Sequence, residues 1–211
     1  MPMNNFANLK ASILHRSKRN DVSDDDIEDY IAQAENEMVY GEIPVRTREM
    51  ETRATATLSI VSRFLALPDY FIAMRRLKIN EPWTGCPDLD IDYVSPEVMF
   101  VSNQTQMPST FTVTSQIEFN CISDDDYTIE MQYLAKLLPL SDSNTTNDIL
   151  TNYPNVYLYG ALTMLFQDIQ EFDLAQYYKQ QFISAINGAN WATNDGKFGP
   201  APCIREEGYT P

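Results

Sequence analysis

The chain contains one histidine, and any Ser-His or Cys-His catalytic pair would have to use it. His15 stands next to Arg16 and close to Lys18 and Arg19. A general base needs a neighbour that accepts a hydrogen bond and orients its imidazole, and cationic side chains cannot do this. We therefore interpret His15 as a solvated surface residue, and we predict no catalytic residue and no enzyme activity.

Carboxylate pairs are the other possible catalytic groups. Acidic triplets occupy residues 24–26 and 124–126, and paired carboxylates could serve a hydrolase. The first triplet follows Ser23 and fits an N-cap with acids in the first helical turn, whereas the second fits a hairpin turn. Both patterns favour structural roles. A small hydrolase stays an open alternative, which converging carboxylates with one raised pKa would indicate.

A metal site is the third possibility. Asp88, Asp90 and Asp92 have the spacing that opens a calcium-binding loop. That loop requires glycine where this chain has Tyr93 and glutamate where it has Met99. The usual phosphate, dinucleotide and zinc motifs are also missing from the sequence. The sequence therefore predicts no metal and no cofactor.

The amino-acid composition of the chain limits which kinds of partner we expect it to bind. Cys86, Cys121 and Cys203 lie far apart and form no CxxC pair, which favours free thiols in a chain made in a reducing cytoplasm. The 15 Lys and Arg residues face 30 Asp and Glu, a net charge of -15 at pH 7. Nucleic-acid binding proteins usually have the opposite balance, so we expect no specific contact with DNA. No run approaches the roughly twenty apolar residues that span a bilayer, so we expect no membrane association.

The sequence pattern predicts helices at both ends of the chain. Residues 6–19 repeat apolar side chains at helical spacing, and Ser23 begins a second helix that Gly41 and Pro44 end. Pro154 suits the first turn of a later helix. Helical patterns over residues 156–169 and 172–189 are expected to form an antiparallel pair.

The middle of the chain changes to a period of two. The segment METRATATL, which ends at Leu58, alternates its side chains as a half-buried strand does. Further short runs are rich in β-branched and aromatic residues, and proline and glycine turns separate most of them. These runs cover residues 63–67, 73–79, 89–94, 111–114, 117–121 and 127–134. They indicate a compact antiparallel β module.

Together the patterns predict an α+β fold, in which N-terminal and C-terminal helices form a bundle, the β module is inserted between them, and an extended C-terminal tail follows. The expected boundaries are 1–45 for the N-terminal helices, 46–138 for the β module, 139–190 for the C-terminal helical hairpin and 191–211 for the tail. The tail is rich in glycine and proline and has isolated large side chains, which is typical of segments that bind partners.

Three segments resemble a known family. SDSNTTNDILTNYPNVYLYGAL, from Ser141 to Leu162, closely resembles part of the podovirus-type bacteriophage head-tail adaptor (connector) family. IPVRTREMETRATATL, from Ile43 to Leu58, and FLALPDYFIAMRRLKI, from Phe64 to Ile79, resemble the same family in the same order. The segments make up about a quarter of the chain directly, and by their order the resemblance covers roughly residues 20 to 190.

The resemblance implies a structural phage neck protein. Such an adaptor forms a ring, normally dodecameric, under the portal after DNA packaging, extends the DNA channel and gives the tail its platform. The implied partners are the portal protein, tail or nozzle proteins and further copies of the chain, while double-stranded DNA passes without specific binding. The implied location is the neck of the virion, after synthesis in the host cytoplasm.

Large side chains of the tail are candidate anchors for the portal or for a neighbouring subunit. They are Trp191, Phe198, Ile204 and Tyr209, with Arg205 as a polar contact. A tail-associated carbohydrate or receptor-binding module is the alternative function. It would present exposed tryptophan or tyrosine rings around a groove, but the middle region contains one tryptophan, Trp83, in a proline-rich loop.

Overall fold

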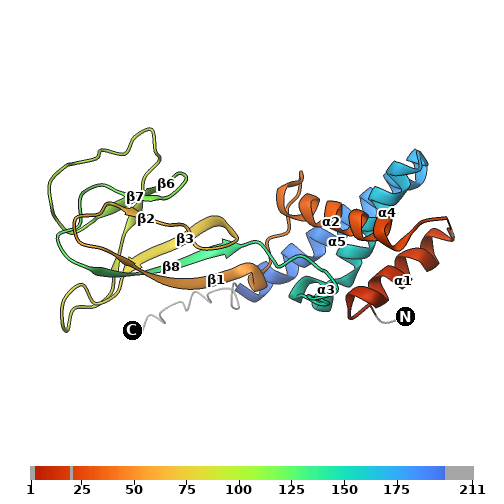
Figure 1. Cartoon of the computed structure of the whole chain (residues 1–211), viewed down its shortest axis with the longest axis horizontal. Coiled ribbons are helices and arrows are strands. Elements are labelled where there is room, and N and C mark those ends of the chain that lie inside the picture. The colour runs from red at the N-terminus through yellow and green to blue at the C-terminus, as the bar shows by residue number, and fades with distance from the viewer. Residues whose placement is uncertain (1–2, 20, 198–211) are drawn as a thin grey trace, which may run out of the picture. The chain divides into compact units, whose positions relative to one another are not determined.

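The structure is a computed structural model that describes residues 3–19 and 21–197, and its chain folds into two units. Of the described residues, those up to Arg48 and from Leu138 onward form a helical unit, and residues 49–137 form a β unit. Helices from both ends of the sequence therefore belong to one unit, and the β-rich stretch is inserted between them (Figure 1). This confirms the predicted α+β fold class.

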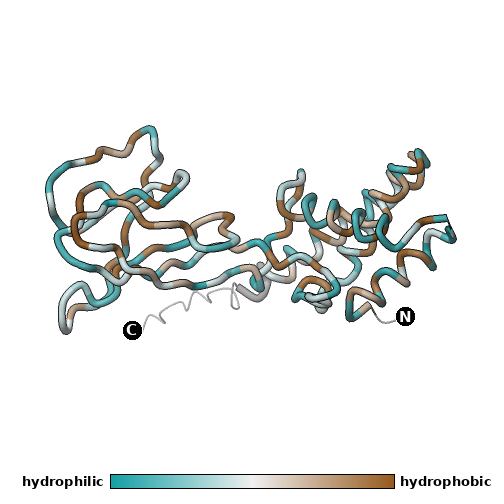
Figure 2. The backbone as a smooth tube through the Cα atoms, in the orientation of Figure 1, coloured by the Kyte–Doolittle hydropathy of each residue, from teal (hydrophilic) through white to brown (hydrophobic). Residues whose placement is uncertain are grey.

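The two N-terminal helices begin and end where the sequence predicts. They are α1, Phe6–Ser17, and α2, Asp24–Tyr40. Ser23 caps α2 in a capping box, in which the Ser23 side chain accepts a hydrogen bond from the Asp26 backbone and the Asp26 carboxylate accepts one from the Ser23 backbone. The apolar residues of α2 that recur at helical spacing are all buried, namely Ile27, Ile31, Ala34 and Met38. Figure 2 shows the alternation of hydrophobic and hydrophilic residues along these helices.

The C-terminal half of the helical unit contains α3, Asp148–Asn152, α4, Pro154–Asp168, and α5, Phe172–Lys197. Pro154 occupies the first turn of α4, as predicted, where its missing N–H has no helical partner to lose. The short helix α3 was not predicted. Its N-cap is Asn147, whose side chain accepts a hydrogen bond from the Leu150 backbone at 2.9 Å.

Three helices meet at Gly160. A Cβ atom at this position of α4 would lie 2.9 Å from the Ala34 Cβ of α2 and 3.0 Å from the Phe182 Cε2 of α5. Next to this crossing, Phe166 of α4 stacks on Tyr178 of α5 with ring centroids 5.3 Å apart. The absence of a side chain at Gly160 therefore sets the separation of α2, α4 and α5.

Helix α5 corrects one prediction. The tail was expected to be extended from Trp191, but the helix continues to Lys197, and residues 198–211 lie outside the described part. The Asn190 side chain accepts a hydrogen bond from the Arg46 backbone at 2.7 Å and donates one to the Pro44 carbonyl at 3.0 Å. The Thr193 hydroxyl accepts a further bond from the Arg48 backbone at 3.4 Å. These bonds satisfy the backbone of residues 44–48 and keep the last turns of α5 helical, although glycine and asparagine residues weaken helix propensity there.

Replacing Asn190 with alanine is expected to lower the free energy of unfolding of the helical unit by about 1–3 kcal/mol, because two partly buried backbone groups lose their partner. Urea unfolding followed by ellipticity at 222 nm measures this change, since every α-helix of the described residues lies in the helical unit. Asn187→Ala is the matched control on the exposed side of the same helix. Equal stability of the two variants would show that the Asn190 bonds contribute nothing.

The β unit contains two four-stranded sheets. One has the order β1-β8-β3-β4 and the other the order β2-β7-β6-β5. The strands are β1 Glu51–Leu58, β2 Phe64–Leu65, β3 Phe71–Ile79, β4 Leu89–Asp90, β5 Asp92–Tyr93, β6 Thr110–Val113, β7 Ile117–Phe119 and β8 Tyr127–Ala135. All named pairs are antiparallel except β5 with β6, which is parallel.

Strand β8 is central to the β unit. It pairs with β1 over the full length of β1 and with β3 on its other side, where β3 has two register shifts. Alternate β8 residues, Tyr127, Ile129, Met131 and Tyr133, are buried in a core that also contains Phe111, Ile117 and Phe119 from the other sheet. The two sheets therefore share one hydrophobic core, and the period of two in the sequence reflects which side chains enter it.

Candidate functional site

Exposed aromatic side chains mark one face of α5. Tyr177 and Trp191 are 54% and 69% exposed, and the two positions are 14 residues apart, close to four helical turns. Between them on this side lie Ser184 and Gly188, both exposed, and no atom lies within 4 Å of a Cβ built at Gly188. We call Tyr177, Ser184, Gly188 and Trp191 the α5 outer face. Two large aromatic rings flanking small residues offer a partner helix both apolar area and close approach.

The predicted anchor residues divide into two groups. Trp191 lies on the α5 outer face and belongs to a helix, not to the extended tail in which it was expected. Phe198, Ile204, Arg205 and Tyr209 lie outside the described residues. Tyr177, the other exposed aromatic residue of this face, was not among the predicted anchors. Its sequence signal was weak, because Tyr177 and Tyr178 are adjacent. In the structure they differ because Tyr178 is partly buried and its ring packs against Phe166 and Tyr159.

A second apolar surface lies at the turn between β1 and β2. Val61 has a φ of 63°, a left-handed conformation that is unusual for a β-branched residue, and its side chain is 74% exposed. The turn is held by hydrogen bonds from the Val61 N–H to the Ser123 carbonyl at 3.0 Å and from the Ile60 N–H to the Asp126 carboxylate at 2.6 Å. Exposed Ile60, Val61 and Phe64 line an open pocket together with Asn103 and Ile122. We call Ile60, Val61 and Phe64 the β1–β2 tip.

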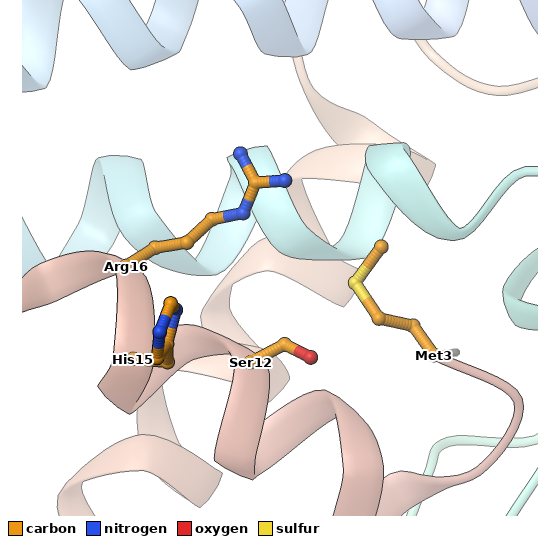
Figure 3. Close-up of a pocket in the computed structure, with 4 residues that line it drawn as sticks. All are labelled: Met3, Ser12, His15 and Arg16. Atoms are coloured by element: carbon orange, nitrogen blue, oxygen red, sulfur yellow. The ribbon is translucent and has the colours of Figure 1, made fainter. Parts of the chain in front are cut away.

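His15 lines a pocket with Met3, Ser12 and Arg16 at the N-terminal end of the chain (Figure 3). Its side chain is exposed, as predicted, and Arg16 is its charged neighbour there. The Ser12 hydroxyl donates to the Asn8 carbonyl of its own helix at 2.8 Å. Because that bond engages the hydroxyl, the pocket brings together no activated serine and histidine.

The acidic residues have structural partners. The first triplet begins α2, as predicted. The prediction of a hairpin at residues 124–126 is wrong, because this loop joins β7 of one sheet to β8 of the other. Asp124 accepts a hydrogen bond from the Tyr127 hydroxyl at 2.9 Å, and Asp126 holds the β1–β2 tip.

Two of the three aspartates of the imitated calcium loop, Asp88 and Asp90, form ion pairs. Arg76 contacts both carboxylate oxygens of Asp90, at 2.6 and 2.8 Å, and Lys78 contacts Asp88 at 2.6 Å. These cations hold the pKa of both carboxyl groups below the usual range, mainly through hydrogen bonds to the charged form. Among the described residues, no group of three or more His, Cys, Asp or Glu side chains is arranged to hold a metal ion.

Tyr30 joins α2 to the end of α4. Its hydroxyl donates to the Asp168 carboxylate at 2.7 Å, and burial together with this bond raises the pKa of Tyr30 to about 12. A phenol whose pKa is higher in the folded than in the unfolded chain stabilises the fold at neutral pH and loses that contribution as pH rises.

The helical unit is therefore expected to lose stability between pH 10 and pH 12, and Tyr30→Phe is expected to reduce this loss. At pH 7 the same variant is expected to be less stable by about 1 kcal/mol, because the hydrogen bond to Asp168 is missing. Urea titrations at 222 nm, repeated at half-unit pH steps, measure both changes. A pH dependence identical to that of the unchanged chain would contradict the assignment to Tyr30.

Comparison with known families identifies the chain. A family model described as SU10 adaptor protein matches residues 4–201, which is nearly the whole chain and includes both units. The search of curated proteins found no match. Among the described residues, no helix is both long and apolar enough to cross a lipid bilayer. The match confirms the resemblance carried by the segments around Ile43, Phe64 and Ser141, and the chain belongs to this family of bacteriophage head-tail adaptors, structural proteins that associate with portal and tail components at the neck of the virion.

Proposed function

We propose that this adaptor assembles as a homo-oligomeric ring, normally of twelve copies, on the portal, where it extends the DNA channel and carries the tail. The observation that carries the proposal is the family match over residues 4–201. A ring of identical subunits needs two different contact patches on each copy, because its interfaces are heterologous. The exposed α5 outer face and the β1–β2 tip are two such candidate patches on different units of the chain.

Five residues are proposed to anchor the chain to the portal or to a neighbouring subunit. They are Trp191, Phe198, Ile204, Arg205 and Tyr209. Trp191 supports this role because a tryptophan that is 69% exposed contributes much apolar area when a partner covers it. The chain continues for fourteen residues beyond α5, which gives it a segment able to reach another molecule.

The negative net charge of the chain supports the proposal that DNA passes through the ring without binding to it. A net charge of -15 makes the average surface repel phosphate groups, and a channel wall that repels DNA does not bind it as it passes during ejection. The shape of the ring, and not a binding site for DNA, is therefore proposed to retain the genome and later let it pass. A direct consequence is weak DNA binding at low salt.

Light scattering of the purified chain, alone and mixed with the portal ring of the same phage, tests the proposal. The expected result is a complex whose mass corresponds to the portal plus about twelve adaptor copies. Trp191→Ala is expected to weaken portal binding at least about tenfold, if the side chain is a central contact. Ala192→Ser, at the next exposed position of α5, is the matched control. Failure of the unchanged chain to join the portal ring would overturn the proposed ring.

A truncation after Lys197 tests the rest of the anchors, because it leaves all described residues in place. If this shortened chain joins the portal as strongly as the full chain, the proposed role of Phe198, Ile204, Arg205 and Tyr209 as portal anchors is wrong. The carbohydrate-binding alternative has less support: Trp83 and Tyr93 of the β unit are 59% and 58% exposed, but the aromatic ring that lines the pocket at the β1–β2 tip is that of Phe64.

A further inference from the structure

The connection between β5 and β6 is long for a structural reason. Because β5 and β6 are parallel, the chain must return from the end of one strand to the start of the other. Residues 94–109 make this return (Figure 1). The Ser102 N–H donates to the Asn120 carbonyl at 2.7 Å, and the Gln106 N–H donates to the Ile122 carbonyl at 2.9 Å. The second half of the connection is therefore fixed to the chain that follows β7.

The first half of the connection folds into a turn. The N–H groups of Val98 and Met99 both donate to the Ser95 carbonyl at 3.0 Å, and Pro96 stands where a β-turn favours proline. This turn displays large apolar side chains. Val98 is 76% exposed and Phe100 is 83% exposed, the highest value among the large apolar side chains of the described residues. The parallel pairing explains the length of the connection, but it does not explain why apolar side chains stand at its surface.

We call Glu97, Val98 and Phe100 the β5–β6 turn. Its side chains are not engaged by the rest of the described chain. Glu97 is exposed and makes no hydrogen bond or ion pair with another described residue. Adjacent exposed apolar side chains on a protein surface mark sites of contact with another protein. Covering Val98 and Phe100 therefore requires a second molecule.

A pocket on the same unit is suited to receive them. We call it the tip pocket, and its volume of about 420 Å³ falls within the range of about 300–1,000 Å³ that is usual for binding pockets. Hydrogen bonds of 2.9 Å hold its wall, from the Ser123 N–H to the Ser62 carbonyl and from the Phe119 N–H to the Arg63 carbonyl. Its lining consists of the β1–β2 tip with Ser62, Arg63, Asn103 and Ile122.

The turn and the pocket also have complementary charges. The Arg63 guanidinium lies 3.5 Å from the Glu118 carboxylate and 5.0 Å from the centroid of the Phe64 ring. A guanidinium has five N–H donors, so Arg63 can bind a second carboxylate while it keeps Glu118. Glu97 precedes Val98 and can supply that carboxylate when the turn enters a pocket.

A second copy of the chain is the occupant that these charges favour. A net charge of -15 makes two copies repel each other on average, so a contact between copies needs a place where opposite charges meet. Arg63 in the tip pocket and Glu97 in the β5–β6 turn provide such a place, with apolar surface beside both. Because the turn and the pocket are different patches of one chain, their contact is heterologous and can repeat around a ring.

We propose that the β5–β6 turn of one copy enters the tip pocket of the neighbouring copy in the ring, where Phe100 and Val98 contact the β1–β2 tip and Glu97 binds Arg63. This inference rests on the proposed function, because a closed ring lets every copy both give one turn and receive another. It assigns the tip pocket to contacts between subunits and leaves the portal to the α5 outer face.

Charge reversal on the two sides of the contact tests the proposal. Glu97→Arg alone brings two cations together at every interface, and Arg63→Glu alone brings carboxylates together. Each is expected to reduce the amount of adaptor bound to the portal ring at least about tenfold, as measured by light scattering. A 1:1 mixture of the two variants can alternate around an even-numbered ring, so every interface again joins opposite charges. The mixture is expected to bind as the unchanged chain does.

Matched variants separate this contact from general effects of charge and folding. Glu81→Arg reverses an exposed acid elsewhere on the β unit and is expected to leave binding unchanged. Arg63→Glu also removes the partner of Glu118, so Phe100→Ala provides a variant that disturbs little packing within the chain. Phe100→Ala is expected to weaken assembly at least about tenfold, whereas Trp83→Ala, which also removes an exposed aromatic ring of the β unit, is expected to have no effect.

Disulfide trapping reports the same contact without the portal. Ile60→Cys is combined with Phe100→Cys in a background that carries Cys86→Ser and Cys203→Ser, and the free protein is oxidised at high concentration. Cys121 is fully buried, so it does not compete. The expected result is a ladder of covalent multimers on non-reducing gels, and either single cysteine variant is expected to give no ladder.

Each outcome decides the proposal. Restoration by the mixture supports it, because a second variant copy repairs neither a contact within one chain nor a contact with the portal. Weak binding by the mixture, or full binding by Glu97→Arg and Phe100→Ala alone, would overturn the inference and leave the ring intact. If the unchanged chain does not join the portal, the proposed portal-bound ring is wrong and the trapping decides the inference. A ladder then supports it, and a cross-linked monomer or no cross-link overturns it.

Discussion

Replacing Glu35 with alanine is expected to lower the free energy of unfolding of the helical unit by about 2–4 kcal/mol. The Glu35 carboxyl accepts a hydrogen bond from the Leu140 backbone at 2.8 Å and one from the Tyr157 hydroxyl at 3.0 Å. Both donors are buried, so each loses its partner without gaining water. The bond to Leu140 holds the chain where it returns from the β unit into the helical unit.

Urea unfolding at 222 nm measures this loss, and Asp29→Ala is the matched control because it removes an exposed acid from the same helix. Tyr157→Phe is expected to cost less, about 1–2 kcal/mol, because Glu35 keeps its bond to Leu140. Burial and the adjacent Glu35 raise the pKa of Tyr157 far above its ordinary value, so its hydroxyl remains a donor at working pH. If Glu35→Ala is no less stable than Asp29→Ala, this account of the network is wrong.

Gly160→Ala is expected to destabilise the helical unit by about 1–3 kcal/mol, although alanine is the better helix former. The added methyl group would lie 2.9 Å from the Ala34 Cβ and 3.0 Å from the Phe182 ring, so α2 or α5 must move. Steric overlap therefore outweighs the propensity gain of about 1 kcal/mol.

Gly188→Ala on α5 is the matched control, because nothing lies within 4 Å of its added Cβ. This variant is expected to gain about 0.5–1 kcal/mol from reduced backbone entropy of the unfolded chain. Thermal unfolding of the free protein compares the two glycines directly. Opposite signs of the two changes support the packing argument, and two stabilising changes would refute it. Phe182→Leu added to Gly160→Ala is expected to restore part of the loss.

Much of the fold could be predicted from local patterns. Ser23 and Pro154 marked the first turns of α2 and α4, and the alternation from Met50 to Leu58 marked β1. Each signal depends on residues a few positions apart, where backbone geometry determines which side chains share a face. The role of the acidic triplet at 24–26 followed from the same local chemistry.

The candidate site was harder to predict. Trp191 was predicted as an anchor in an extended tail, and the structure shows that it is exposed but helical; its helix was not predicted because glycine and asparagine near Gly188 resemble a helix end. What keeps this part of α5 helical is Asn190, which binds the backbone of Arg46, 144 residues away in the sequence. The hairpin expected at 124–126 failed for a related reason, since strand order decides whether consecutive strands pair.

The sequence by itself determined the fold class, the positions of most helices and strands, the acidic charge and the family resemblance. The tertiary structure alone decided the length of α5, the buried Glu35 network and the close crossing at Gly160. Periodicity and capping act within one or two helical turns, so sequence spacing records them. Pairing, burial and exposure depend on residues brought together from distant segments, and no local spacing specifies which surface stays uncovered for a partner.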